Sequence, residues 1–231
     1  MRHDDRHVVN SGGAQTVLTN GTASATTVSS GGRLTVSSGG TAVGVTQLAG
    51  AALVTNTSAT VSGTNANGVF TIVSGTAQNV IVENGGALTV LAGNTAINTS
   101  VGSGGVDTVL AGGTASGSFV SVGRSEVVSA GGTTVGTTVT SNGSQTVFGT
   151  ASGTTAMRGG NVIVSAGGTT NGTVVSSGGR EVVSSGGTTR RTQVVSGGTQ
   201  DVAGGTTSNT QVSSGGQQVV SSGGITRGTG G

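Results

Sequence analysis

The sequence predicts an all-β fold, a parallel β-helix solenoid of about twelve coils with a 19-residue repeat, and three observations support this prediction. Pairs of glycines recur with this period, and an aliphatic residue follows each pair at a fixed distance. The composition is the third observation, because 48 of the 231 residues are Gly and none is Pro, Cys, Trp or Tyr. A conventional globular core needs more Leu and aromatic side chains than this. Collagen is excluded because there is no Pro and no Gly at every third position.

The glycine pairs mark one turn in every repeat. Eight complete and four degenerate pairs give twelve units between residues 12 and 215, with a mean step of about 18.5 residues. Asn replaces the first Gly in two degenerate pairs, and Asn is the other residue that tolerates a left-handed backbone. The complete pairs begin at Gly12, Gly31, Gly85, Gly104, Gly159, Gly178, Gly197 and Gly215, and the degenerate pairs are Ala49-Gly50, Asn67-Gly68, Gly123-Arg124 and Asn142-Gly143.

Short strands are expected on both sides of each pair. Val precedes the pair by three residues in nine of the twelve units, and an aliphatic residue follows its first member by five residues in all twelve. Glycine and β-branched residues at this density oppose helix formation. A unit with two or three apolar side chains cannot bury a core alone, so the coils must stack. The aliphatic residues after the pairs are Val17, Val36, Val54, Ile72, Val90, Val109, Val128, Val147, Val164, Val183, Val202 and Val220.

The stacking fixes the expected dimensions and organisation. Coils spaced by about 4.8 Å would form a rod of roughly 55–60 Å, and the general preference for right-handed crossovers predicts a right-handed helix. A second Gly-rich turn and then a Thr complete most units, as at Gly39-Gly40 and Thr41. The pattern breaks at residues 41–80 and 148–158, where we expect altered loops. We predict a disordered or artificial N-terminal segment at residues 1–8 and one solenoid domain at residues 9–231.

Charge and composition exclude several classes of protein. The net charge is +2, and the nine Arg are spread along the chain, whereas nucleic-acid binding needs a dense basic stripe. Without Cys there is no disulfide framework and no thiolate metal site. No run of 18 apolar residues predicts a membrane span. Since the first residues lack the apolar stretch of a signal peptide, we expect a piece of a longer protein.

The acidic residues do not predict an enzyme. Asp107 and Glu126 occupy the same position in neighbouring coils, where they would stack about 5 Å apart. We interpret this position as an outward, solvated ladder, and the alternative is a catalytic pair that cleaves a polysaccharide. The His and Asp residues at positions 3–7 could bind a metal but precede the first repeat. We predict no catalytic residues, no metal site and no cofactor.

Serines are concentrated at the glycine turns. Ser is small, polar and suited to turns, so these residues could serve the backbone alone. The functional alternative is an array of exposed hydroxyl groups between short strands, available for O-linked sugars. The candidate O-glycosylation sites are Ser11, Ser29, Ser30, Ser37, Ser38, Ser103, Ser129, Ser165, Ser176, Ser177, Ser184, Ser185, Ser196, Ser213, Ser214, Ser221 and Ser222.

The segment from Val175 to Thr189, Val-Ser-Ser-Gly-Gly-Arg-Glu-Val-Val-Ser-Ser-Gly-Gly-Thr-Thr, resembles the 19-residue repeat of AIDA-type self-associating autotransporter adhesins. The resemblance, which includes AIDA-I-like and TibA-like repeats, covers residues 9–230. It implies a β-helical passenger on the bacterial cell surface that mediates adherence, autoaggregation and biofilm formation. It also implies Ser O-heptosylation by an autotransporter heptosyltransferase. Because the family's signal peptide, autochaperone region and membrane β-barrel are not recognisable, we expect a passenger fragment.

The resemblance implies two partners, other copies of the passenger and the heptosyltransferase, and leaves the host or bacterial receptor unknown. Self-association would then arise from many weak polar contacts along the rod, because repetition produces avidity. Two other functions stay open. The chain could be an inert structural stalk, or an ice-binding solenoid whose face is a ladder formed by Thr22, Thr41, Thr95 and Thr114.

Overall fold

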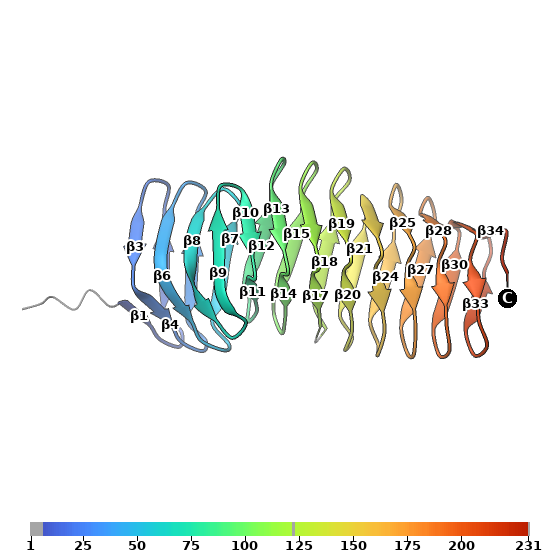
Figure 1. Ribbon diagram of the computed structural model, residues 1–231, viewed down its shortest axis with the longest axis horizontal. Helices are drawn as coiled ribbons and strands as arrows, with labels where there is room; N and C mark the ends of the chain where they lie inside the picture. Colours follow the sequence, from blue (N-terminus) through green and yellow to red (C-terminus); the bar gives the residue numbers. More distant parts are fainter. Residues whose placement is uncertain (1–6, 122, 231) are drawn as a thin grey trace, which may run out of the picture.

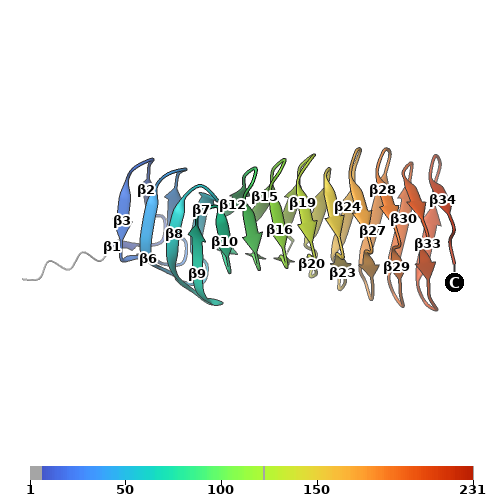
Figure 2. The same ribbon diagram turned by 45° about the horizontal axis from the view of Figure 1, so that its top comes forward.

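The computed structural model describes residues 7–121 and 123–230, and these residues wind into an elongated β-solenoid (Figure 1). Successive coils lie side by side from one end of the rod to the other, as the turned view in Figure 2 also shows. Every regular element in the described residues is a strand, so none of them offers a helix that could cross a membrane. The predicted parallel solenoid and its repeat length are confirmed.

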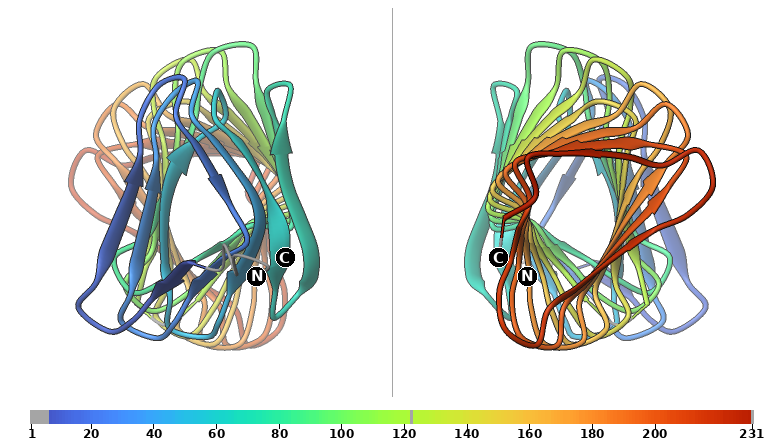
Figure 3. Two further views of the ribbon diagram at one scale, coloured as in Figure 1. Left: turned by 90° about the vertical axis from the view of Figure 1, so that its left-hand side faces the viewer. Right: turned by 90° about the vertical axis from the view of Figure 1, so that its right-hand side faces the viewer.

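Each regular coil contributes one strand to each of three sheets, which together enclose the interior (Figure 3). In one such coil, β15 (Val106–Val109) belongs to sheet B, β16 (Thr114–Ser116) to sheet A and β17 (Phe119–Val120) to sheet C. Pairing with the next coil is parallel and in register. Val106 lies beside Ser125, its equivalent one repeat further along the chain.

Sheet A has 15 strands, sheet B has 11 and sheet C has 8. The strands of sheet A are β1 (His7–Val9), β3 (Thr22–Ser24), β4 (Thr26–Val28), β6 (Thr41–Gln47), β8 (Thr60–Asn65), β9 (Gly68–Val73), β10 (Thr76–Gln78), β13 (Thr95–Ile97), β16, β19 (Thr133–Val135), β22 (Thr150–Ser152), β25 (Thr169–Asn171), β28 (Thr188–Arg190), β31 (Thr206–Ser208) and β34 (Ile225–Arg227). The strands of sheet B are β2 (Ala14–Val17), β5 (Arg33–Val36), β7 (Ala52–Asn56), β12 (Ala87–Val90), β15, β18 (Ser125–Val128), β21 (Ser144–Val147), β24 (Asn161–Val164), β27 (Arg180–Ser184), β30 (Thr199–Ala203) and β33 (Gln217–Val220). The strands of sheet C are β11 (Ile81–Val82), β14 (Ser100–Val101), β17, β20 (Thr138–Val139), β23 (Thr155–Ala156), β26 (Val174–Val175), β29 (Gln193–Val194) and β32 (Gln211–Val212).

Each coil turns at three places. The first turn leads into sheet B and contains the repeated glycine pair, and the second turn leads from sheet B to sheet A. The third, which we call the corner, leads from sheet A to sheet C and uses a single left-handed residue. Successive corners have Asn98 (φ 55°), Gly117 (φ 65°), Gly136 (φ 68°), Gly153 (φ 62°), Gly172 (φ 68°), Arg191 (φ 55°) and Asn209 (φ 54°). This corner was not predicted from the sequence, because it is marked by one variable residue rather than by a Gly pair.

The irregular region at residues 41–80 contains an antiparallel insertion. The predicted unit at Asn67-Gly68 is a hairpin tip, where β8 and β9 pair antiparallel within sheet A. Ile72 is buried, but it therefore lies in sheet A rather than in the column formed by Val17 and its equivalents. The alignment of Val54 with that column was also wrong. The backbone equivalent of Gly31 is Gly50, so the true unit begins one residue later and Thr55 points inward instead.

The second irregular region is a shortened coil. Thr133 pairs with Thr150 rather than with Ser152, which the regular repeat would require, because Phe148 and Gly149 make a tighter second turn. The strands on either side keep their register, so the repeat resumes at once. At the N-terminal end, β1 starts at His7 and pairs in parallel with β4. The division into segments 1–8 and 9–231 remains a prediction, since residues 1–6 lie outside the described part.

Candidate functional site

The serine-containing turns have a common backbone geometry. In the turn from Ser29 to Gly32, the Gly32 amide donates a hydrogen bond of 2.9 Å to the Ser29 carbonyl, and Gly31 has φ of 76°. A four-residue turn with positive φ at its third position is a type II turn, which favours Gly there. Ser29 is therefore the first residue of the turn, and Ser30 is the second.

The position in the turn determines how exposed each candidate serine is. The second residue lies at the outer edge of the coil, whereas the first residue is half-buried beside the strand, except in the last coil, where the first residues Ser213 and Ser221 are exposed. The exposed candidates are Ser11, Ser30, Ser38, Ser103, Ser177, Ser185, Ser196, Ser213, Ser214, Ser221 and Ser222. The half-buried candidates are Ser29, Ser37, Ser129, Ser165, Ser176 and Ser184. The structure thus divides the predicted sites into two classes that differ in accessibility.

The left-handed glycine of one coil also makes room for the serine of the preceding coil. A Cβ at Gly31 would lie 2.6 Å from Oγ of Ser11, and a Cβ at Gly50 would lie 2.6 Å from Oγ of Ser30. Both glycines are thus required by their φ angle and by the hydroxyl group beside them. Along this edge of the rod, the hydroxyl group of a serine in one coil therefore lies beside a glycine, which has no side chain, in the next coil.

One exposed serine at the second position of a turn was missed by sequence reasoning, in a turn of a different type in which both Ser141 (φ 50°) and Asn142 (φ 62°) are left-handed. Ser141 is the second residue of the turn from Thr140 to Gly143, which closes with a hydrogen bond of 2.8 Å between those two residues. The turn has Asn142 in place of the first Gly, so it lacks the Ser-Gly-Gly pattern. The signal available in the sequence was the degenerate Asn-Gly pair itself, which marks the turn.

The serine pattern is interrupted in the middle of the rod. The second turns of three successive coils present Ala92, Ala111 and Ala130 where other coils present an exposed Ser. Together with Leu91 and Leu110 they line an open groove of about 780 Å³. Hydroxyl groups are therefore available at both ends of this edge but not at its centre.

The predicted Thr ladder is present on the outer face of sheet A. Thr22 pairs with Thr41, and a second run continues in register from Thr76 through Thr95 and Thr114. The neighbouring outward column is irregular, because Ile97, Ser116, Val135, Ser152, Asn171 and Arg190 follow one another in it. The aligned Thr residues that an ice-binding face would need are therefore limited to a single column of sheet A.

The carboxylates expected on the surface lie inside the rod, so their interpretation as a solvated outward ladder was wrong. Asp107 and Glu126 are paired in register on β15 and β18, and both side chains are completely buried. The alternation of strand side chains places the third residue after the first Gly of the pair on the inner face. No substrate can reach these two carboxylates, so they cannot cleave a polysaccharide.

Glu126 belongs to an interior network of hydrogen bonds. Its Oε2 accepts hydrogen bonds from Nε2 of Gln145 at 2.7 Å and from Oγ1 of Thr137 at 2.9 Å. Gln145 in turn accepts a hydrogen bond of 3.0 Å from Thr154. Oε1 of Glu126 and both carboxylate oxygens of Asp107 have no hydrogen-bond partner among the described residues. Of the two buried acids, Glu126 thus has hydrogen-bond donors to one carboxylate oxygen, and Asp107 has none to either within the described part of the chain.

Burial controls the protonation of these acids. It raises the pKa of Asp107 well above its usual range, and the adjacent Glu126 carboxylate raises it further. Burial also raises the pKa of Glu126 and of Glu181, although hydrogen bonds to Gln145 and Gln200, respectively, oppose the effect. In the part of the chain that the structure describes, no group of three His, Cys, Asp or Glu could hold a metal ion. His3, Asp4 and Asp5 lie outside that part.

Comparison with known proteins places this geometry in a family. The family model described as "Adhesin of bacterial autotransporter system, probable stalk" (AIDA) matches residues 5–51 and 62–124. A solved structure, "Crystal structure of TibC-catalyzed hyper-glycosylated TibA55-350 fragment", is 33% identical in sequence over 95% of this chain and 82% of that chain, with a TM-score of 0.67. The chain belongs to the AIDA family of bacterial autotransporter adhesins. Among curated proteins no match was found.

Membership of the AIDA family fits the architecture described above. The gap in the family match, residues 52–61, covers β7 and the start of β8, immediately before the antiparallel hairpin. The family places this chain in the cell-surface passenger of an autotransporter adhesin and describes such repeats as a stalk. The likeness to the TibA fragment extends beyond the family match, because it covers nearly all of the solenoid.

Proposed function

We propose that this solenoid is a non-catalytic adhesin passenger that mediates adherence, autoaggregation and biofilm formation and is O-heptosylated on its exposed turn serines by an autotransporter heptosyltransferase. The observation that carries the proposal is the exposed second position of the type II turns, which holds Ser in both terminal parts of the rod. The likeness to a hyper-glycosylated TibA fragment supports the modification.

The geometry favours one class of serine as the acceptor. A transferase must reach the hydroxyl group, so exposed residues such as Ser30, Ser177 and Ser196 are better acceptors than the half-buried Ser29 and Ser176. Ser177 and Ser196 occupy the same place in successive coils, and the Ser177 amide donates a hydrogen bond of 3.0 Å to the Ser196 carbonyl. Sugars on such neighbours would form a continuous row along one edge of the rod.

Self-association follows from the same repetition. Each coil presents Ser, Thr, Gln or Asn side chains at its edges, and a single contact between two such edges is weak. A rod of many identical coils lets two passengers on opposed cells make these contacts simultaneously, and avidity rises with their number. No receptor-binding cleft is needed for this mode of adherence.

The proposal is tested by displaying the chain on bacteria through a carrier, with and without a co-expressed heptosyltransferase, and measuring the settling rate. We expect settling faster than with the empty carrier, and heptose on exposed turn serines by mass spectrometry of glycopeptides. Ser177→Ala with Ser196→Ala should remove two modified positions without unfolding the rod, because Ala49 occupies the equivalent position of the first turn naturally.

Ser129→Ala with Ser165→Ala, at half-buried positions, is the matched control and should leave the glycopeptides of the exposed serines unchanged. If the displayed chain causes no clumping and no adherence, with or without the transferase, the function that remains is an inert stalk. Modification confined to the half-buried serines would contradict the proposed acceptor class.

A further inference from the structure

A groove on the outer face of sheet A combines arginine, amide and hydroxyl side chains. It has a volume of about 540 Å³ and lies across β22, β25, β28 and β31, which follow one another in the C-terminal part of the rod (Figure 1). Its lining includes Arg190 and Arg191, both exposed, and the polar residues Thr150, Thr169, Asn171, Ser208 and Asn209. Volumes of this size are typical of small-molecule sites.

Arg191 occupies a backbone position that does not suit it. It is the left-handed corner residue, with φ of 55°, where the two preceding coils have Gly172 and Gly153. A long L-side chain is rarely found in this conformation, and such outliers gather at functional sites. No side-chain hydrogen bond or ion pair of Arg191 within the described residues offsets the strain. The fold therefore gives no reason for an arginine at this corner.

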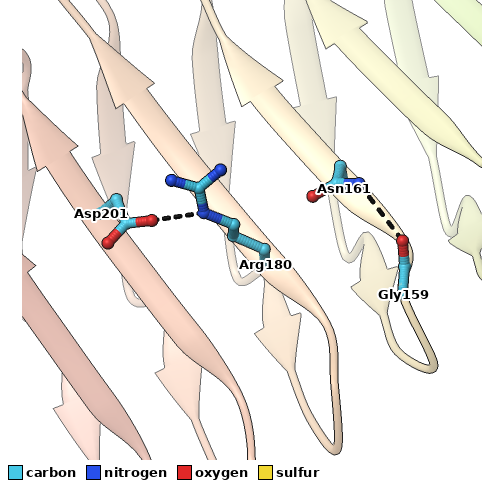
Figure 4. A network of polar contacts seen from close by, with 4 residues as sticks. All are labelled: Gly159, Asn161, Arg180 and Asp201. Carbon is cyan, nitrogen blue, oxygen red and sulfur yellow. Dashed lines mark hydrogen bonds and ion pairs between the residues drawn. The ribbon is translucent and has the colours of Figure 1, made fainter. Parts of the chain in front are cut away.

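The charge around the groove is unopposed. Arg227 follows Arg190 in the same outward column of sheet A, two coils further along, at a distance on the order of 10 Å. The acids after residue 126 are Glu181, which is buried, and Asp201, which is paired with Arg180 on sheet B (Figure 4). The exposed surface at the groove is thus positive, and it attracts anions.

We propose that this groove binds an anionic saccharide that carries carboxylate or sulfate groups. A guanidinium group forms paired hydrogen bonds with a planar carboxylate or a sulfate, and the amide and hydroxyl groups beside it match sugar hydroxyls. The inference rests on the proposed adhesive function, since it names the class of receptor that the rod contacts. The polar lining favours a saccharide over a nucleic acid, because no aromatic side chain is present in the groove for base stacking.

The test measures binding of the purified full chain to a sulfated heparin hexasaccharide, to a carboxylated oligogalacturonate and to a neutral oligosaccharide. We expect binding to one or both acidic saccharides, weakened by salt, and none to the neutral one. Arg190→Asn with Arg191→Gly should weaken binding at least tenfold. The preceding coil has Asn171 and Gly172 at these places, so the variant should fold as the parent does.

Arg33→Ala is the matched control, because Arg33 is exposed on β5 in the N-terminal half and its loss should leave the affinity unchanged. Equal affinity for single-stranded DNA of the same charge would overturn the saccharide assignment. Unchanged binding by the double variant, or no binding to either acidic saccharide, would overturn the site. Settling of cells is measured separately, so a chain that causes clumping but binds neither acidic saccharide refutes this inference and leaves the adhesive function intact.

Discussion

Outside the irregular region at residues 41–80, the two halves of the rod share parallel coils paired in register, but their interiors differ. In the N-terminal half the buried inward residues of sheet B include Leu34, Leu53 and Leu88, and Phe70 packs inside the same cluster. In the C-terminal half the inward column that continues from Leu88 holds Asp107, Glu126, Gln145, Val162, Glu181 and Gln200, all buried. In sheet B, parallel pairing continues unbroken from one half into the other. The turns and the β-ladder therefore specify the coil, while its interior can be apolar or polar.

The polar interior is stable because the column is surrounded by threonines. Glu181 accepts hydrogen bonds from Thr170 at 3.0 Å, from Thr192 at 2.9 Å and from Gln200 at 2.7 Å. Buried polar groups are tolerated when such partners are present and are costly when they are not. The comparison predicts that the stability of the N-terminal half is most sensitive to loss of buried side-chain volume. The stability of the C-terminal half should be most sensitive to loss of buried hydrogen bonds or to a change of buried charge.

The largest effect is expected for Phe70→Ala. Phe70 is the bulkiest fully buried side chain, and its removal leaves a cavity in the N-terminal core. We expect the free energy of unfolding to fall by about 3–5 kcal/mol, measured by chemical denaturation. Phe119→Ala is the control, because Phe119 is 46% exposed and should cost far less. Equal losses for the two variants would contradict the assigned cores.

A change of pH should act on the other half. The pKa values of Asp107 and Glu126 are raised in the folded state. The free energy of unfolding is therefore highest at low pH, where both acids are neutral, and it falls as the pH rises from about 4 through the pKa values of the folded state. Leu88 and Gln145, the inward residues of the coils on either side, are uncharged, and Glu181 lies three coils away. We expect a loss on the order of a few kcal/mol over the rise.

Asp107→Asn with Glu126→Gln should flatten this dependence, since the variant chain no longer has the two ionisable groups. The measurement is the midpoint of denaturant unfolding from pH 4 to pH 9. Glu181→Gln serves as the matched control with a single buried acid, and it should flatten the dependence less. A double variant that retains the parent's full pH dependence would show that the pair is not its source.

An intermediate effect is expected when the two interiors are exchanged at single positions. Gln145→Leu removes the donor to Glu126 and leaves Thr154 without its acceptor, at a cost of about 1–3 kcal/mol. Leu88→Gln places an amide beside Asp107, whose carboxylate oxygens have no partner among the described residues, and should therefore cost less. Thermal unfolding of both variants checks this. A more stable Gln145→Leu chain would show that the network adds nothing to stability.

The smallest effect is expected at the surface. Arg180 and Asp201 form an ion pair on neighbouring strands of sheet B, with the Arg180 side chain 53% exposed (Figure 4). Exposed pairs contribute between about 0 and 1 kcal/mol, and salt screens them. Asp201→Asn should therefore shift the unfolding midpoint slightly at low salt and not at all in 0.5 M salt, a concentration at which screening lengths fall below roughly 5 Å. A shift that persists in high salt would contradict a screened surface pair.

Most of the architecture could be predicted because glycine turns leave a local record in the sequence. The recurrence of Gly31 and its equivalents specifies a left-handed turn, and the Val residues around it specify inward positions, so coil and spacing follow. The hairpin at Asn67-Gly68 could not be told from one more turn, because the same dipeptide suits both. The register error at Val54 arose in the same way, since Ala49-Gly50 was read as the pair instead of Gly50-Ala51.

The candidate serines were also found from their turns, but their accessibility was not. Ser29 and Ser30 look equivalent in sequence, and only the turn geometry makes the first half-buried and the second exposed. Asp107 was wrongly predicted to point outward, because a polar residue in a strand normally faces water. Its burial depends on the stacking of neighbouring coils, which no local pattern reports.

The sequence by itself determined the repeat, the strand-and-turn chemistry of each coil and the positions of the serines, because these depend on residues close together along the chain. The tertiary structure decided what lies inside the rod and what gathers on its faces. Asp107 meets Glu126 because successive coils stack in register, and Arg190 and Arg191 lie beside Asn171 and Ser208 in one groove for the same reason. Contacts between coils join residues that are a whole repeat apart in the sequence, and only the closed winding of the chain brings them together.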